Sequence, residues 1–151
     1  MLQVVLVEPE IHPNTGNIAR LCAATGTRLH LIEPLGFRTD EAAVKRAGLD
    51  YWPHVDIHKH VNLKAFRDAV PDTRCWYFTT KVKRSYTSVR YECGDCLFFG
   101  SETAGLPREL LDANQEQCVT IPMLTPHVRS LNLAAAAAIA LYEALRQLGK
   151  T

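Results

Sequence analysis

Short apolar runs alternate along the chain with stretches of helical periodicity. The apolar runs predict strands, because a strand of a parallel sheet is buried on both faces. We expect strands at residues 2–7, 29–32, 55–57, 75–79, 96–99 and 119–121. We expect helices at residues 14–25, 40–47, 62–70, 107–113 and 131–148, several of which end at glycine or proline. This alternation predicts an α/β fold with a mostly parallel sheet flanked by helices.

The ends of these helices carry recognisable capping residues. Asn14 or Thr15 is available to cap helix 14–25, and Ser130 is available to cap helix 131–148. Pro107 suits the first position of helix 107–113.

The last helix contains an unbroken run of alanines at 134–138. Alanine is the best helix former, and a face of small residues also lets a second backbone approach closely. A plain core helix and a helix that packs against a second subunit therefore both fit. Tyr142 shares a face with Ile139 and Arg146, away from the apolar stripe of this helix.

Composition narrows the class of protein. A chain of 151 residues, 47% apolar and 22% charged, fits one globular domain spanning 1–151. The sequence has no run of 18 consecutive apolar residues, so we expect no membrane-spanning helix. The first residues lack the features of a signal peptide. Five cysteines, an odd number, favour reduced thiols in the cytoplasm.

The formal net charge is only +1, whereas nucleic-acid-binding proteins are usually more basic. Positive charge is nevertheless concentrated in one segment with no intervening acidic residue: Lys81, Lys83, Arg84 and Arg90. Tyr86 and Tyr91 lie among or beside these cations. Such a segment can bind phosphates and stack on unpaired bases, although a solvated basic loop is the alternative.

Three loops, each following a predicted strand, are candidates for chemistry: residues 8–20, 97–107 and 121–132. Ligands of open parallel sheets bind beyond the carboxyl ends of the strands. The first loop places Arg20 close to the helical face of Asn17, the second brackets polar residues between Gly100 and Gly105, and the third is stiffened by two prolines. Taken singly, each loop is also explained as an ordinary capped turn.

Several other patterns carry little weight. The chain has no dinucleotide-binding glycine motif, no Walker loop and no nucleophile elbow. Cys93 and Cys96 make up a single Cys-x-x-Cys motif. A zinc ribbon needs two such motifs, and this one precedes a strand rather than opening a helix, which argues against a redox motif. A solvated polar face explains His54, His58 and His60 better than a metal site does.

Taken together, the loops resemble the motifs of the SPOUT superfamily of RNA methyltransferases, and the likeness covers essentially the whole chain. The motifs are residues 14–20 (NTGNIAR), 99–107 (FGSETAGLP), and 121–123 (IPM) with 129–133 (RSLNL). Residues 8–11 (EPEI) and 31–37 (LIEPLGF) resemble the subgroup that methylates the ribose of the tRNA wobble nucleotide, position 34.

This resemblance implies a deep trefoil knot in the C-terminal half, an exception to ordinary chain topology. It also implies a homodimer that binds tRNA across both subunits, which would bring two copies of each basic segment together. The expected cofactor is S-adenosylmethionine, converted to S-adenosylhomocysteine, with no metal. The expected substrate is cytidine or modified uridine at position 34 of tRNA-Leu isoacceptors.

The resemblance also assigns residues. The expected cofactor-binding residues are Phe78, Thr79, Gly100, Ile121, Met123, Ser130 and Leu131. The expected catalytic group comprises Arg20, Glu102, Ser130, Asn132 and Tyr142. The expected RNA-binding cations are Lys81, Lys83, Arg84 and Arg129.

Within the catalytic group, Arg20 is expected to orient the acceptor hydroxyl and to promote its deprotonation. An arginine is a poor free base, so it would act by stabilising a developing alkoxide or a nearby phosphate. Glu102, from the same or the partner subunit, would orient Arg20. Ser130 and Asn132 would position Arg20 or the ribose, and Tyr142 would contact RNA.

The chain departs from the family at Ala104, where arginine is common, so we expect Arg108 or Arg129 to substitute. The loop 125–128 is one residue longer than is usual. Alternatives are methylation at another tRNA or rRNA position, a non-catalytic module that binds cofactor and RNA, and an enzyme acting on a small nucleotide.

Overall fold

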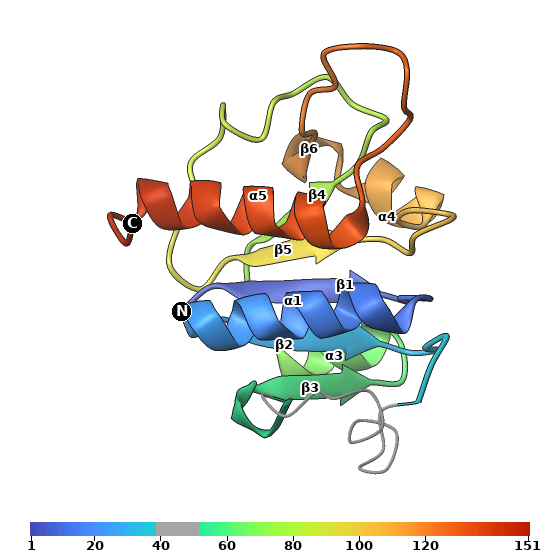
Figure 1. Cartoon of the computed structure of the whole chain (residues 1–151), viewed down its shortest axis with the longest axis vertical. Coiled ribbons are helices and arrows are strands. Elements are labelled where there is room, and N and C mark those ends of the chain that lie inside the picture. The colour runs from blue at the N-terminus through green and yellow to red at the C-terminus, as the bar shows by residue number, and fades with distance from the viewer. Residues whose placement is uncertain (39–51) are drawn as a thin grey trace.

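The computed structural model describes residues 1–38 and 52–151, and within them one six-stranded sheet forms the centre of the molecule (Figure 1). Its strands are β1 (Gln3–Val7), β2 (Arg28–Ile32), β3 (Ile57–His60), β4 (Cys75–Phe78), β5 (Cys96–Phe99) and β6 (Cys118–Val119). Their order is β3-β2-β1-β5-β4-β6, and every pair is parallel. The predicted α/β architecture with a mostly parallel sheet is confirmed.

Helices cover both faces of this sheet. They are α1 (His12–Thr25), α3 (Leu63–Ala69), α4 (Arg108–Ala113) and α5 (Leu133–Gln147), with short 3-10 turns at Trp52–His54 and Gln115–Gln117. Helices α1 and α5 lie side by side on one face, and α3 and α4 lie behind the sheet (Figure 1). The helix predicted at 40–47 lies outside the described residues. None of the described helices is long and apolar enough to cross a membrane.

The two-sided core follows from the alternation of side chains along buried strands. On one face, Val4 and Leu6 of β1 belong to a cluster with residues of α1 and α5 such as Ile18 and Leu141. Val5, on the opposite face, belongs to a second cluster that includes residues of α3 and α4. Burial on both sides explains why the strands read as continuous apolar runs rather than as alternating patterns.

Two predicted helix caps are wrong. Helix α1 begins at His12, two residues early, with Ile11 at the N-cap position, while Asn14 and Thr15 are buried inside its first turns. Helix α5 is capped by Asn132, not Ser130: the Asn132 Oδ1 atom accepts from the Ala135 amide at 3.1 Å. In both cases the tertiary environment of the side chain, rather than intrinsic capping preference, decides where the helix starts.

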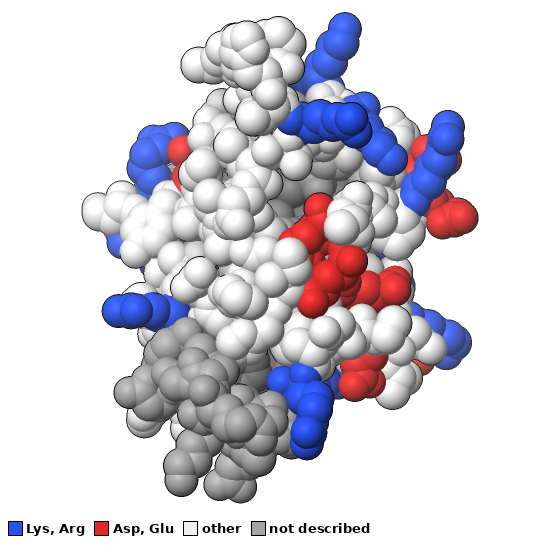
Figure 2. Space-filling model, turned by 45° about the vertical axis from the view of Figure 1, so that its right-hand side comes forward, with Lys and Arg blue, Asp and Glu red and all other residues white. Residues whose placement is uncertain are grey.

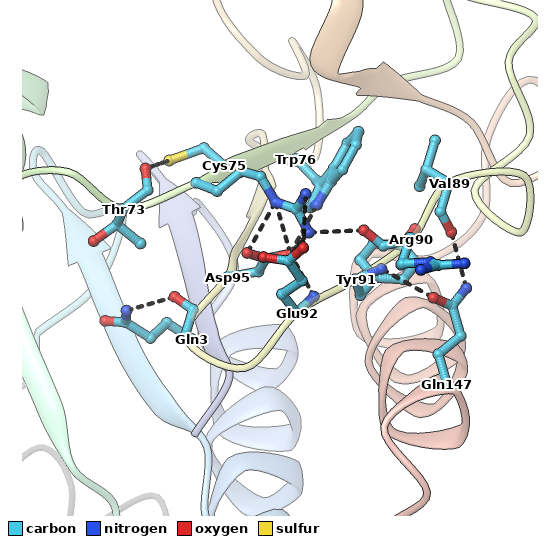
Figure 3. Close-up of polar contacts among 12 residues, drawn as sticks. Gln3, Thr73, Cys75, Trp76, Val89, Arg90, Tyr91, Glu92, Asp95 and Gln147 are labelled. Atoms are coloured by element: carbon cyan, nitrogen blue, oxygen red, sulfur yellow. Dashed lines mark hydrogen bonds and ion pairs between the residues drawn. The ribbon is translucent and has the colours of Figure 1, made fainter.

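A buried carboxylate organises the turn before β5 (Figure 3). Asp95 is 3% exposed and accepts hydrogen bonds from Arg74 Nη2 (2.7 Å), Trp76 Nε1 (3.0 Å) and the Glu92 amide (2.9 Å). The guanidinium of Arg74 also donates to the Arg90 carbonyl at 2.7 Å and lies 5.1 Å from the Trp76 ring centroid. The hydrogen bonds that Arg74 donates to Asp95 raise the pKa of the Arg74 guanidinium above its usual value. This network ties the start of β5 to the start of β4.

Gln147, at the end of α5, connects that helix to the segment before β5 (Figure 3). Its Oε1 atom accepts from the Tyr91 amide at 2.9 Å, and its Nε2 atom donates to the Val89 carbonyl at 3.0 Å. The long segment between β4 and β5 is therefore anchored at its far end by Arg74, which bonds to Arg90 and Asp95, and by α5.

The solvated face predicted for His54, His58 and His60 is present in part: His54 is exposed, and His58, with its side chain 42% exposed, bonds to Asp56 at 2.6 Å. His58 and His60 also form a cluster with the buried His30. His30 is 1% exposed, and its ring nitrogens bond to His60 Nε2 at 2.9 Å and to Gln3 Oε1 at 2.7 Å. The ring of His58 lies 5.5 Å from that of His30. Among the described residues, no group of three or more His, Cys, Asp or Glu side chains is arranged to hold a metal ion, and all five cysteines are free.

This cluster predicts a loss of stability in mild acid. Burial, followed by the neighbouring charges of His60, His58 and Arg28, lowers the pKa of His30 to about 3, and burial also lowers the pKa of His60. The unfolded chain therefore binds more protons than the folded one between about pH 3 and pH 6.5. The free energy of unfolding should fall as pH drops through this window, by up to about 1.4 kcal/mol per pH unit for each such proton.

Urea unfolding of the wild type and of His30→Gln at pH 7.5, 6.5 and 5.5 measures the effect. The variant should show a shallower dependence on pH than the wild type. His127→Ala, which removes an exposed histidine, is the matched control and should keep the wild-type slope. An equal slope in His30→Gln would show that another group governs the acid sensitivity.

Candidate functional site

The candidate site lies at the carboxyl edge of the sheet, where the strand order changes direction. The chain runs outward from β1 through β2 to β3, whereas β5 lies on the opposite side of β1. Ligands of open parallel sheets bind at such a switch point, because the loops after the two central strands diverge there and leave a crevice. Here the diverging loops are residues 8–11 after β1 and 100–107 after β5.

Two carboxylates hold these loops together reciprocally. Glu102 accepts from the amides of Glu10 and Ile11, each at 2.8 Å, and so satisfies the N-cap amide of α1 and the amide before it. Glu10 in turn accepts from the Thr103 amide at 2.9 Å and from Thr103 Oγ1 at 2.6 Å. These bonds from Thr103 lower the pKa of Glu10 because they favour its charged form.

The third loop joins the other two through a pair of asparagines. Asn14 donates from Nδ2 to Glu102 Oε2 at 3.1 Å and accepts at Oδ1 from Asn132 Nδ2 at 3.0 Å. Asn132 also caps α5, so its position is fixed from both sides. The chain Glu102–Asn14–Asn132 thus connects the three loops that the sequence analysis selected, and they converge at one place.

A cavity of about 570 Å³ opens between these loops and the ends of β4, β5 and β6. Its lining includes every residue predicted to bind cofactor: Phe78, Thr79, Gly100, Ile121, Met123, Ser130 and Leu131. Glu102, Asn132, Lys81 and Arg129 also line it. The volume falls in the usual range for small-molecule sites, and the mixture of apolar side chains with loop backbone is typical of them.

A close backbone contact explains why residue 100 is a glycine, and the sequence did not reveal this contact. A Cβ atom at this position would overlap the backbone of Gly105 and Leu106. The loop folds back on itself there, with the Gly105 amide donating to the Ser101 carbonyl at 2.9 Å. The glycine therefore permits a close approach within the loop, in addition to any approach to a ligand.

Arg20 lies apart from this cavity. It is exposed on α1, six residues beyond Asn14, which corresponds to about 9 Å along the helix axis. Both oxygens of Glu102 bond to the start of α1, and Asn132 bonds to Asn14 and Ala135. The expectation that Glu102 or Asn132 positions Arg20 within one chain is therefore wrong. Arg20 makes no hydrogen bond or ion pair with residues 1–38 and 52–151 of its own chain.

Tyr142 also lies outside the cavity lining, on α5, with its side chain 48% exposed. Ile139 on the same helix is 38% exposed, and Ile11 at the start of α1 is 47% exposed. The sequence prediction that Tyr142 and Ile139 lie away from the core stripe of α5 is confirmed.

The basic segment serves more than one purpose. Arg84 Nη1 donates to the carbonyls of Glu116 at 2.6 Å and Gln115 at 3.2 Å, so this predicted RNA contact already holds the turn before β6. Tyr91 is 2% exposed, and its hydroxyl donates to the Tyr86 carbonyl, so stacking of Tyr91 on a base is excluded. Lys81 and Lys83 remain exposed.

The charge distribution on this side of the molecule is uneven (Figure 2). Acidic side chains gather in the middle of the face shown, beside a hollow, and basic side chains project around them. Glu10 and Glu102 line the two cavities at this edge, and Lys81, Arg108 and Arg129 also line them. Lys81 lines both cavities, which makes it, besides Arg108 and Arg129, a candidate to replace the arginine absent at position 104.

Sequence reasoning missed two residues that build the site. It assigned Asn14 to helix capping and gave Glu10 no role. The spacing of these residues could not reveal a partner about 90 or more positions away in the chain. The only available signal was the density of Asn, Thr and Glu residues in loops 8–20 and 97–107.

Comparison with known proteins gives consistent matches. Residues 1–142 match the model of the SpoU rRNA Methylase family. A tRNA (cytidine(34)-2'-O)-methyltransferase from Aeromonas hydrophila is 53% identical over 150 residues, covering 99% of this chain and 96% of the relative. A solved structure from work on the 2-OH methylation of C/U34 on tRNA has a TM-score of 0.92 and 49% identity, covering 100% of this chain and 98% of that one. An AdoMet-bound rRNA methyltransferase from Sinorhizobium meliloti has a TM-score of 0.81 and 25% identity, covering 97% of this chain and 56% of that one.

Proposed function

The chain belongs to the SpoU rRNA Methylase family, and on that premise we propose that it methylates the 2′-hydroxyl of the nucleotide at position 34 of tRNA. The observation that carries the proposal is the likeness, over nearly the whole chain, to a tRNA (cytidine(34)-2'-O)-methyltransferase. The proposed substrates are cytidine or modified uridine in tRNA-Leu isoacceptors, and the proposed location is the cytoplasm. Residues 1–151 are assigned to one methyltransferase domain.

S-adenosylmethionine is the proposed cofactor, and the cavity of about 570 Å³ fits it. Phe78, Ile121, Met123 and Leu131 offer apolar contacts for an adenine ring, while the backbone at Gly100 and the hydroxyls of Thr79 and Ser130 offer polar ones. When bound, the cofactor would supply a sulfonium methyl group whose carbon the ribose oxygen attacks in line, so that the carbon–sulfur bond breaks and S-adenosylhomocysteine leaves.

The residues of the chain align the reactants and stabilise the ribose oxygen as its proton leaves. The Glu102–Asn14–Asn132 chain keeps the three loops in one arrangement, and Ser130 and Asn132 position the ribose. Fixing two reactants in this way can contribute about 7–11 kcal/mol at best. Arg20 stabilises the developing alkoxide, and Tyr142 contacts the RNA.

This assignment requires a homodimer, because Arg20 lies outside the cavity of its own chain. Exposed apolar side chains at the N-cap of α1, in loop 121–132 and on α5 support such an interface: Ile11, Leu124, Val128, Leu131, Ile139 and Tyr142. A two-fold contact across these elements would bring Arg20 of one subunit towards the cavity of the other.

The proposal includes the trefoil knot of the SPOUT superfamily in the C-terminal half. Its support is the way in which the segment after β4 pairs with the segment after β6. Ser85 forms a parallel bridge with Thr120, and the Thr120 amide donates to the Arg84 carbonyl at 2.8 Å. The Tyr86 amide also donates to the Thr120 carbonyl at 2.9 Å, and loop 121–132 follows before α5 begins (Figure 1).

The function is tested by mass spectrometry of tRNA nucleosides from cells with and without the gene, together with methyl transfer by the purified enzyme to tRNA from the deleted strain. Loss and restoration of one 2′-O-methyl nucleoside at position 34 is the expected result. If the methyl group is lost instead at another tRNA or rRNA position, that position is the substrate and the assignment to position 34 is wrong. If the protein binds cofactor and RNA without turnover, it is a non-catalytic binding module and not an enzyme.

RNA binding gives a further prediction. Replacing Lys81 and Lys83 by glutamine should weaken tRNA binding and flatten its salt dependence, because two phosphate contacts are lost. The slope of log affinity against log salt should decrease by about 1–2. Arg84 is left unchanged because it supports the turn before β6.

Filter binding across a salt series measures this slope. Lys64→Gln on α3, an exposed cation on the other face of the sheet, is the matched control and should keep the wild-type slope. An unchanged slope in the double variant would remove Lys81 and Lys83 from the interface.

A further inference from the structure

A second cavity, of about 620 Å³, adjoins the proposed cofactor cavity. The two cavities share the loop 103–106 together with Ser101 and Lys81, so they meet along one seam. The second cavity extends from this seam towards the loop after β2, where Leu35 and Gly36 line it. A nucleotide whose ribose lies at the seam can therefore place its hydroxyl towards one cavity and its base in the other.

Apolar, acidic and basic side chains all line the second cavity. Val7, Leu35 and Leu106 supply apolar surface, Glu8 supplies a carboxylate, and Lys81 and Arg108 supply cations. Apolar surface with a few polar groups of both signs suits a flat heterocycle attached to an anionic backbone.

Of the three carboxylates that line the two cavities, Glu8 is the one that the described residues leave without a partner. The carboxylates of Glu10 and Glu102 are occupied by amides and hydroxyls of the loops. The Glu8 side chain is exposed and makes no hydrogen bond or ion pair with the described part of the chain. A carboxylate without a partner at the rim of a cavity is available to accept hydrogen bonds from a ligand.

The backbone at Glu8 is held in an unfavourable conformation. Its φ is 53°, in the left-handed region that non-glycine residues rarely adopt, and the residue precedes Pro9, which restricts it further. The surroundings enforce this conformation: the Glu8 amide donates to the Ile32 carbonyl at 2.9 Å, and the Gly36 amide donates to the Pro9 carbonyl at 2.9 Å. Strain of about 1–3 kcal/mol of this kind is concentrated at ligand sites.

We propose that the second cavity binds the nucleobase of the acceptor nucleotide and that Glu8 favours cytosine over uracil. This inference rests on the proposed function and adds its base selectivity. A carboxylate accepts from the exocyclic amino group of cytosine, whereas uracil presents an acceptor oxygen at the same position. Lys81, at the seam, pairs with a phosphate next to the ribose.

The test uses two full-length tRNAs, identical except for C34 or U34, isolated from cells that lack the enzyme so that other modifications are present. Glu8→Gln keeps the size of the side chain but removes its charge. The ratio of kcat/KM for C34 over U34 should fall about tenfold to a hundredfold, mainly through a slower reaction at C34. Glu8→Ala should lower the ratio in the same direction.

Glu109→Gln is the matched control, because this exposed carboxylate on α4 lines neither cavity. It should keep the wild-type ratio. An unchanged ratio in an active Glu8→Gln enzyme overturns the role of Glu8 and leaves the proposed methyl transfer intact. A wild-type enzyme inactive on both tRNAs overturns the base site and the proposed function together.

Discussion

An Arg20→Ala enzyme should fold and bind S-adenosylmethionine normally but lose methyl transfer by about 10²–10⁴-fold. The fold should be unaffected because Arg20 is exposed and contributes no hydrogen bond or ion pair to the described part of its chain. Catalysis should suffer because a cation that stabilises an alkoxide acts only as the transition state forms. Single-turnover methyl transfer and calorimetric titration of the cofactor measure the two properties separately.

Arg20→Lys separates charge from geometry. A lysine keeps the positive charge but loses the planar fork, so partial activity indicates that the charge matters most. Lys64→Ala on the other face of the sheet is the matched control and should remain fully active. Near-normal turnover of Arg20→Ala would reject the role of Arg20.

A subunit-mixing experiment decides which cavity Arg20 serves. Met123→Glu places a charge in the cavity, and this variant alone should be inactive. If Arg20 acts across the dimer, mixed dimers of Arg20→Ala and Met123→Glu regain one working site, formed by the intact cavity of the first and Arg20 of the second. If Arg20 acts within its own chain, the mixture stays inactive.

Asp95→Ala should give the largest loss of stability, about 3–5 kcal/mol. Removing this carboxylate leaves the Trp76 indole nitrogen and the Glu92 amide without an acceptor, and it leaves Arg74 without its main ion-pair partner. The turn lies before β5, at the opposite end of the strand from the cavities. The variant should therefore lose stability while the protein that remains folded binds cofactor normally.

Urea unfolding measures this difference. Asp56→Ala is the matched control, because Asp56 also bonds to an arginine, Arg28, at 2.8 Å, but lies at the surface with its side chain 45% exposed. Solvent screening limits such exposed pairs to about 0.2–1 kcal/mol. Equal losses in the two variants would show that burial of Asp95 does not set the strength of its network.

Much of the fold follows from local pattern. The strands are buried on both faces, so their apolar runs predicted six strands and a parallel sheet without knowledge of any partner. Helix ends were less predictable: Asn14 and Thr15 have high capping preference, yet they lie inside α1, and Glu102, distant in the chain, accepts from the N-cap amide of Ile11.

The site divides in the same way. The sequence identified three candidate loops from their position after predicted strands, and its resemblance to the SPOUT superfamily assigned seven cofactor residues, all of which line one cavity. Only the tertiary structure decided how these loops connect and that Arg20 lies outside the cavity. It also decided that Arg84 bonds to the turn before β6 and that the Glu8 backbone is strained. The physical reason is range: hydrophobic periodicity acts between neighbours in the chain, whereas hydrogen bonds such as that between Asn132 and Asn14 depend on how the whole sheet brings distant loops together.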